Sequence, residues 1–163
     1  MSIQLLPRPQ NMEFTSLITF ATGMVFGAVF GAALGAIVMF VNGFLSPVGQ
    51  AGLNLPFQIS GMVILGIVGG LYARTVKGEL STRGFGELAV LGAFLTFVYD
   101  IITNIGFALF LIIYGLRPFP DAILIALVSG AIPSVIHVGW NLALFGVAAV
   151  PLVSAMKRMV RWR

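Results

Sequence analysis

The 60 residues from Phe14 to Ala73 contain no charged side chain. Two further stretches, Ile101 to Leu116 and Ala122 to Met156, also lack Asp, Glu, Lys and Arg. A membrane-spanning helix needs about 20 apolar residues, and the soluble core of one small domain cannot bury three runs this long. The chain is 59% hydrophobic and 9% charged, far from the ordinary globular range. The sequence therefore predicts an all-α membrane protein, a polytopic helical bundle.

The glycines of the first apolar run divide it. As one straight helix the run would measure about 48 Å, against a hydrocarbon core of about 30 Å. It is therefore either one strongly tilted helix or a hairpin, and we favour a hairpin cornered at Gly27. Its other glycines, Gly23, Gly31 and Gly35, are expected mainly to pack helices together. The whole chain forms a single transmembrane domain with five expected spans, at residues 14–26, 28–46, 57–73, 85–115 and 122–156, the last bent near Pro133.

The basic residues stand in short tracts beside the apolar runs, which is typical of a membrane surface and not of a nucleic-acid partner. If the loop 74–83 and the C-terminus share one side, that side holds seven Lys and Arg and the other side holds two. The positive-inside rule then predicts a multi-pass cell-membrane protein with a cytoplasmic C-terminus. The chain has no cysteine, which excludes disulfides and thiolate metal sites.

Several polar side chains interrupt the apolar runs and are candidates for a site, because such groups are costly inside a membrane. His137 and Asn141 are four residues apart and share a helix face, with Trp140 beside them. Asp100 needs a partner, a proton or a watery cavity, and Asn104 lies one helical turn further on. The candidate substrate-binding residues are His137, Asn141, Trp140, Asp100, Asn104, Gln58 and Asn54.

Each candidate also has a purely structural interpretation. His137 could be a packing residue or the hydrogen-bond partner of Asp100, and Trp140 could face lipid. Gln58 and Asn54 could simply solvate a loop. The predicted orientation places most of these side chains in the outer half of the bundle, which favours a pocket open to the outside.

The chain contains, in order, EFTSLITFATGMVFGAVFGAALGAIVMFVNGF, SPVGQAGLNLPFQISGMVILGIVGGLYAR, a long span, and GAIPSVIHVGWNLALF. This order of features resembles the S components of energy-coupling factor (ECF) transporters. S components are small six-helix membrane proteins that capture vitamins and related micronutrients. The resemblance implies a hairpin at MVFGAVFG, an outer loop at SPVGQAGLNLP, and a last helix whose Pro133, His137 and Asn141 face the ligand. In that family a first transmembrane helix precedes the hairpin, and residues 1–13 cannot supply it. We therefore expect an upstream extension of the chain or a separate helix.

The resemblance also implies partners: a small-molecule micronutrient, the lipid bilayer, a membrane coupling subunit and two ATPase subunits. Docking on the coupling subunit could use smooth surfaces at Gly66 and Gly70 or at Gly31 and Gly35. There is no GxxxxGK[ST] phosphate-binding loop, so another subunit must supply the energy of ATP.

The sequence favours a non-enzymatic substrate-capture subunit with no cofactor. One histidine and one acid make no convincing zinc site, and no nucleophile motif accompanies them. Two alternatives stay open: a non-transporting membrane scaffold or assembly subunit, and a small intramembrane enzyme that uses Asp100 and His137.

Overall fold

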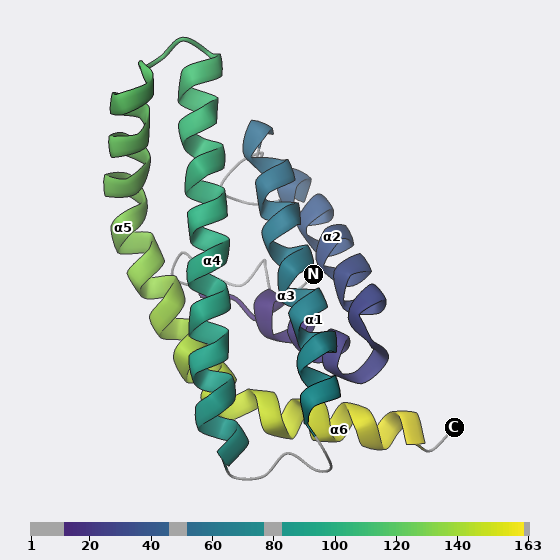
Figure 1. The fold of residues 1–163 in the computed structure, drawn as a ribbon. Coiled ribbons are helices and arrows are strands. Elements are labelled where there is room, and N and C mark those ends of the chain that lie inside the picture. Colours follow the sequence, from purple (N-terminus) through teal and green to yellow (C-terminus); the bar gives the residue numbers. More distant parts are fainter. Residues whose placement is uncertain (1–11, 46–51, 77–82, 162–163) are drawn as a thin grey trace.

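The computed structural model describes residues 12–45, 52–76 and 83–161, and its regular elements there are helices (Figure 1). Apolar runs fold this way in a membrane because a helix satisfies its own backbone hydrogen bonds. Pro56 and Pro120 stand in the first turns of their helices, where the missing N–H costs nothing. The elements are α1 (Thr15–Phe26), α2 (Ala28–Leu45), the 3-10 turn η2 (Gly52–Asn54), α3 (Leu55–Thr75), α4 (Arg83–Ile113), α5 (Phe119–Leu144), the π-helical turn η3 (Phe145–Ala149) and α6 (Val150–Arg161).

Four helical stretches of the described chain are long and apolar enough to cross a membrane: Ala28–Leu45, Gly52–Thr75, Gly84–Ile113 and Phe119–Val160. The protein is therefore an all-α membrane bundle. The remaining expected span, residues 14–26, corresponds to α1. Its 12 residues fall short of the number that a crossing requires.

Gly27 forms the corner between α1 and α2. Its φ of 97° and ψ of 165° define a backbone conformation that residues with a side chain rarely adopt. The amide of Gly27 still donates a hydrogen bond to the carbonyl of Gly23 at 2.9 Å, so α1 ends cleanly before the chain turns back. The break matches the hairpin that the glycine pattern favours.

The other glycines of this run bring α1, α2 and α3 into backbone contact. A Cβ atom on Gly31 would lie 2.6 Å from the carbonyl oxygen of Gly66, and one on Gly35 would lie 2.7 Å from that of Met62. A Cβ atom on Gly23 would also overlap Gly66, and one on Gly70 would overlap Ala28 of α2. These glycines are consumed by packing inside the bundle, so Gly31, Gly35, Gly66 and Gly70 do not form the free docking surface that we expected.

Helices α4 and α5 form a long antiparallel hairpin, and the chain then changes direction. α5 contains Pro133 without ending there. It passes through η3 into α6, which lies across the end of the bundle (Figure 1) and contacts α1. The candidate stretch Phe119–Val160, which covers the expected span 122–156, therefore changes direction within its length. Val153 of α6 is fully buried whereas Arg158 is exposed, so α6 packs one face on the bundle and leaves a basic face free.

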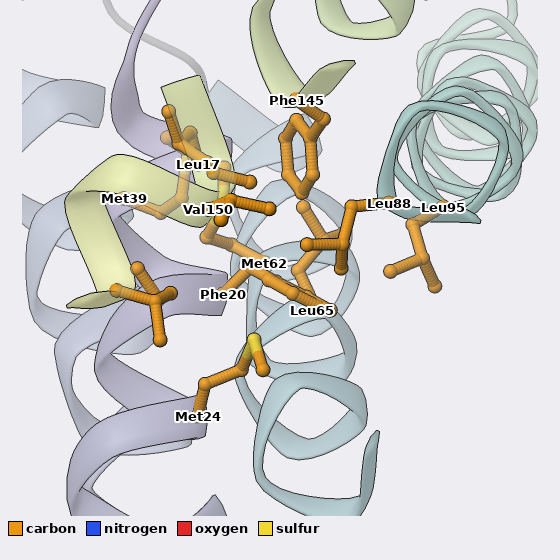
Figure 2. Packing of buried hydrophobic residues seen from close by; sticks show 13 residues of the cluster. Leu17, Phe20, Met24, Met39, Met62, Leu65, Leu88, Leu95, Phe145 and Val150 are labelled. Carbon is orange, nitrogen blue, oxygen red and sulfur yellow. The ribbon is translucent and has the colours of Figure 1, made fainter. Parts of the chain in front are cut away.

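The hydrophobic core lies where α1, α3, α4 and η3 meet. The rings of Phe20 and Phe145 pack edge to face with centroids 5.4 Å apart. Gly92 of α4 makes room for Phe145, because a Cβ atom there would collide with the ring. Figure 2 shows Phe145 among the apolar side chains around it. The core residues are Leu17, Phe20, Ala21, Met24, Met39, Met62, Leu65, Leu88, Leu95, Phe145, Ala149, Val150 and Val153.

Candidate functional site

A buried hydrogen bond joins the two long helices α4 and α5. Nδ1 of His137 lies 2.8 Å from Oδ1 of Asp100, and the two residues are 4% and 7% exposed. Antiparallel packing brings them to the same level, just as it brings Gly92 opposite Phe145. A bond between a carboxylate and an imidazole is charge-assisted when either group is ionised, so it is stronger than a neutral hydrogen bond. The pairing that the sequence left open is therefore formed.

A third ionisable side chain completes what we call the acid–histidine cluster: Glu13, His137 and Asp100. Oε1 of Glu13 lies 3.8 Å from Nε2 of His137, which is an ion-pair distance beyond hydrogen-bond reach. Glu13 lies two residues before α1 begins at Thr15, and its Oε1 accepts a hydrogen bond from the Ser16 hydroxyl at 2.8 Å. The two carboxylates thus face different nitrogens of the one imidazole ring.

Glu13 is not among the site residues predicted from the sequence, although the short length of the helix that follows it indicates that it is buried. The arm that follows, α1, has 12 residues and is only about 18 Å long. If its far end at Gly27 reaches one membrane surface, its beginning must lie within the hydrocarbon depth. A carboxylate placed two residues before such a short helix is therefore brought inside the bundle.

The pKa of the Glu13 carboxyl group is set by its burial and by its hydrogen-bond partners. Burial raises the pKa of its carboxyl group, but His137 and the hydroxyls of Thr15 and Ser16 outweigh that effect. The net pKa of Glu13 lies below its ordinary value of 4.5. Glu13 is therefore a carboxylate at neutral pH.

Two aromatic side chains contact residues of the acid–histidine cluster. The ring of Tyr99 meets the imidazole of His137 edge-on, with centroids 5.7 Å apart. The Tyr99 ring fits because Gly61 of α3 has no side chain: a Cβ atom there would lie 2.6 Å from Cδ2 of Tyr99. The indole N–H of Trp140 donates to the backbone carbonyl of Glu13 at 2.9 Å. Trp140 is therefore a structural anchor of the cluster as well as an aromatic surface.

Three buried polar atoms at this level have no hydrogen-bond partner among the described residues: Oδ2 of Asp100, Nε2 of His137 and Oδ1 of Asn141. Asn141 is fully buried, and its amide nitrogen lies 3.3 Å from the backbone carbonyl of His137. Leaving a buried polar atom unpaired costs about 1–3 kcal/mol. These three atoms are hydrogen-bonding capacity that the described residues leave unused at this level.

The other three predicted residues, Asn104, Asn54 and Gln58, lie outside the acid–histidine cluster. The amide of Asn104, one turn from Asp100, packs against Gly130 of α5. Asn54 packs against Gly106 of α4, and it precedes α3, in which Gln58 lies. Oδ1 of Asn54 and Oε1 of Gln58 are also buried without a partner among the described residues. The structure therefore brings four of the predicted residues together: His137, Asp100, Asn141 and Trp140. Asn104 lies one helical turn from Asp100, and Asn54 lies at the contact between η2 and α4.

A separate groove of about 570 Å³ opens on the surface between α3 and α4. It is lined by Tyr72, Gly86, Glu87, Val90, Leu91 and Phe94. The hydroxyl of Tyr72 donates to Oε2 of Glu87 at 2.9 Å there. None of the seven predicted residues lines this groove.

No three His, Cys, Asp or Glu side chains of the described chain are grouped so that they could hold a metal ion. The cluster explains this, because Asp100 faces Nδ1 of His137 whereas Glu13 faces Nε2. The two carboxylates therefore do not converge with a ring nitrogen on one point. Compared with known proteins, the chain matches no family model, no curated protein and no solved structure.

Proposed function

We propose that this protein is the substrate-capture subunit of an ECF-type importer. In this proposal it binds a small vitamin or related micronutrient in a pocket open to the outside of the cell. A coupling subunit and two ATPase subunits then deliver the substrate. One observation carries the proposal: the unpartnered polar atoms of Asp100, His137 and Asn141 lie buried between two membrane-spanning helices. Polar groups retained at such depth typically belong to a substrate path or site.

The surroundings of these atoms are those of a small-molecule site. Such sites combine an apolar lining with a few polar groups that fix the orientation of the ligand. Here Tyr99 and Trp140 supply aromatic surface, and Asp100, His137 and Asn141 supply the polar contacts. The order of hairpin, loop and the polar helix that holds His137 and Asn141 resembles S components, and this resemblance is the basis for the proposed class of substrate and partners.

The distribution of charge supports the direction of capture. Arg74 at the end of α3, and Lys157 and Arg158 in α6, belong to the end of the bundle at which α6 lies (Figure 1). By the positive-inside rule that end faces the cytoplasm, so the opposite end of α4 and α5 faces outward. Since the glycine surfaces are used within the bundle, a coupling subunit would dock on other residues.

Native mass spectrometry of the protein, purified without added ligand, tests the proposal directly. We expect a bound small molecule whose affinity falls by about tenfold or more in His137→Ala and in Asn141→Ala, since each removes a polar contact. Ser129→Ala is the matched control, because the exposed Ser129 hydroxyl bonds only to carbonyls of its own helix α5. Unchanged affinity in both site variants would reject the site. Purification in an unrelated complex, with no small molecule bound, would favour the scaffold alternative.

A further inference from the structure

The acid–histidine cluster holds two carboxyl groups and one imidazole. With both carboxylates ionised and His137 protonated, its net charge is −1, and with His137 neutral it is −2. The ion pairs formed by the described residues both use His137, and no Lys or Arg of that part of the chain pairs with Glu13 or Asp100. An uncompensated charge inside a membrane is expensive. A proton or a cationic guest would balance the charge that the described residues leave unpaired.

The unpartnered atoms specify which groups a guest should present. Oδ2 of Asp100 and Oδ1 of Asn141 are acceptors, on residues that are 7% and 0% exposed. Nε2 of His137, on a residue that is 4% exposed, points at Glu13 Oε1 across 3.8 Å without a hydrogen bond. A guest rich in N–H donors satisfies these acceptors, whereas a carboxylate or phosphate would be repelled by Glu13 and Asp100.

The same geometry favours an organic cation over a metal ion. The two carboxylates lie beside different nitrogens of the His137 ring and cannot converge on one small ion. Tyr99 and Trp140 place aromatic rings at the cluster. Such rings attract organic cations through their π faces.

We propose that the acid–histidine cluster selects a small organic cation bearing N–H donors, such as an amidinium or a protonated amine. In this proposal the carboxylate of Asp100 provides the electrostatic preference for a cation over a neutral molecule. The inference rests on the proposed capture function and names the class of its substrate. Glu13 contributes the second negative charge, and Asn141 accepts a further hydrogen bond.

A pair of isosteric probes tests the charge preference. Benzamidine is cationic at neutral pH, and benzamide has nearly the same shape without the charge. Dissociation constants for both are measured by calorimetry on the full chain in lipid nanodiscs at pH 7. We expect wild-type protein to bind benzamidine at least about tenfold more tightly than benzamide, and Asp100→Asn to lose that preference. Asp121→Asn is the matched control, because Asp121 is exposed in the first turn of α5, and it should keep the preference.

Each outcome decides the inference. Benzamide binding as tightly as benzamidine, a preference that survives Asp100→Asn, or no binding of benzamidine at all would overturn it. If Asp100→Asn does not fold, the comparison of the two probes on wild-type protein decides alone. Recovery of a neutral or anionic micronutrient whose binding depends on His137 and Asn141 would overturn the cation selectivity and leave the capture function standing. Absence of any bound small molecule would remove both.

Discussion

The indole Nε1 of Trp140 donates a hydrogen bond to the backbone carbonyl of Glu13 at 2.9 Å. This contact fixes the beginning of α1 against α5, and the edge-to-face packing of Phe14 on Trp140, with centroids 5.9 Å apart, supports it. Because the backbone of Glu13 is held here, its carboxylate is held near His137. The charge balance of the cluster therefore depends on a residue that precedes the first helix.

Breaking the bond between Asp100 and His137 should be costly, and the two substitutions should not be additive. Asp100→Ala leaves His137 without its partner at Nδ1, and removing one member of a buried pair typically costs about 3–5 kcal/mol. His137→Ala should behave similarly. The double variant should be more stable than the sum of the two effects predicts, by about 1–3 kcal/mol. Unfolding free energies from denaturant titration in mixed micelles measure this cycle, and strict additivity would show that the two side chains are uncoupled.

Substitution of Gly66 should damage the bundle through its backbone contacts. A Cβ atom on Gly66 would overlap the backbone of Gly31 and Ala32 in α2, so Gly66→Ala must separate two helices. Overpacking of this kind costs about 1–3 kcal/mol. Gly139→Ala in α5 is the control, since a Cβ atom there meets nothing within 4 Å. Alanine is the better helix former by up to about 1 kcal/mol, so Gly139→Ala should be neutral or stabilising. Equal thermal midpoints for the two variants would contradict the packing role.

Gly27→Ala tests backbone strain without any steric contact. A Cβ atom on Gly27 has open space around it, yet the φ of 97° is unfavourable for any residue with a side chain. We expect a loss of about 1–3 kcal/mol from the strain alone. Gly86→Ala shares the open surroundings in a helix of ordinary backbone angles and is the matched control. A Gly27→Ala protein as stable as wild type would mean that the corner can form with another backbone conformation.

The contribution of Glu13 to stability should vanish in acid. Its pKa in the folded protein lies below 4.5, so its stabilisation is fully present above about pH 4.5 and is lost as the pH falls through the lowered pKa. The groups that face it are His137, Tyr99, Asp100 and the hydroxyls of Thr15 and Ser16. Thermal midpoints of wild type and Glu13→Gln, compared from pH 3 to pH 7, should differ most near neutrality and converge in acid. A difference that does not change with pH would contradict the ionised state of Glu13.

Much of the fold could be predicted because it follows from properties that are local in sequence. The uncharged runs set the long helices, and the glycine spacing set the corner at Gly27. The change of direction after α5 could not be predicted in the same way. It occurs at Phe145–Ala149, where Phe145 packs on Gly92 and Phe20, residues that are distant in sequence. Pro151, in the first turn of α6, was the one local signal for a new helix.

The site was partly predictable for the same reason. His137 and Asn141 share a helix face by spacing alone, and an isolated acid such as Asp100 requires a partner in a membrane. Glu13 lies 124 residues before His137 and joins it only through the short α1 and its anchor on Trp140. Asn54 depends likewise on tertiary packing, because its position against Gly106 is set by how α3 meets α4. Sequence periodicity carries no information about either contact.

The backbone contacts among Gly23, Gly31 and Gly66 have a consequence for how this chain can tolerate mutation. Positions at which two main chains touch penalise every larger residue whatever the ligand, whereas positions that hold a guest are constrained only when the guest matters. A library of variants selected for folding alone should therefore lose diversity at these three glycines and retain it at Asn141. Under the proposed capture function, a second selection for growth on the captured nutrient should then restrict Asn141 as well.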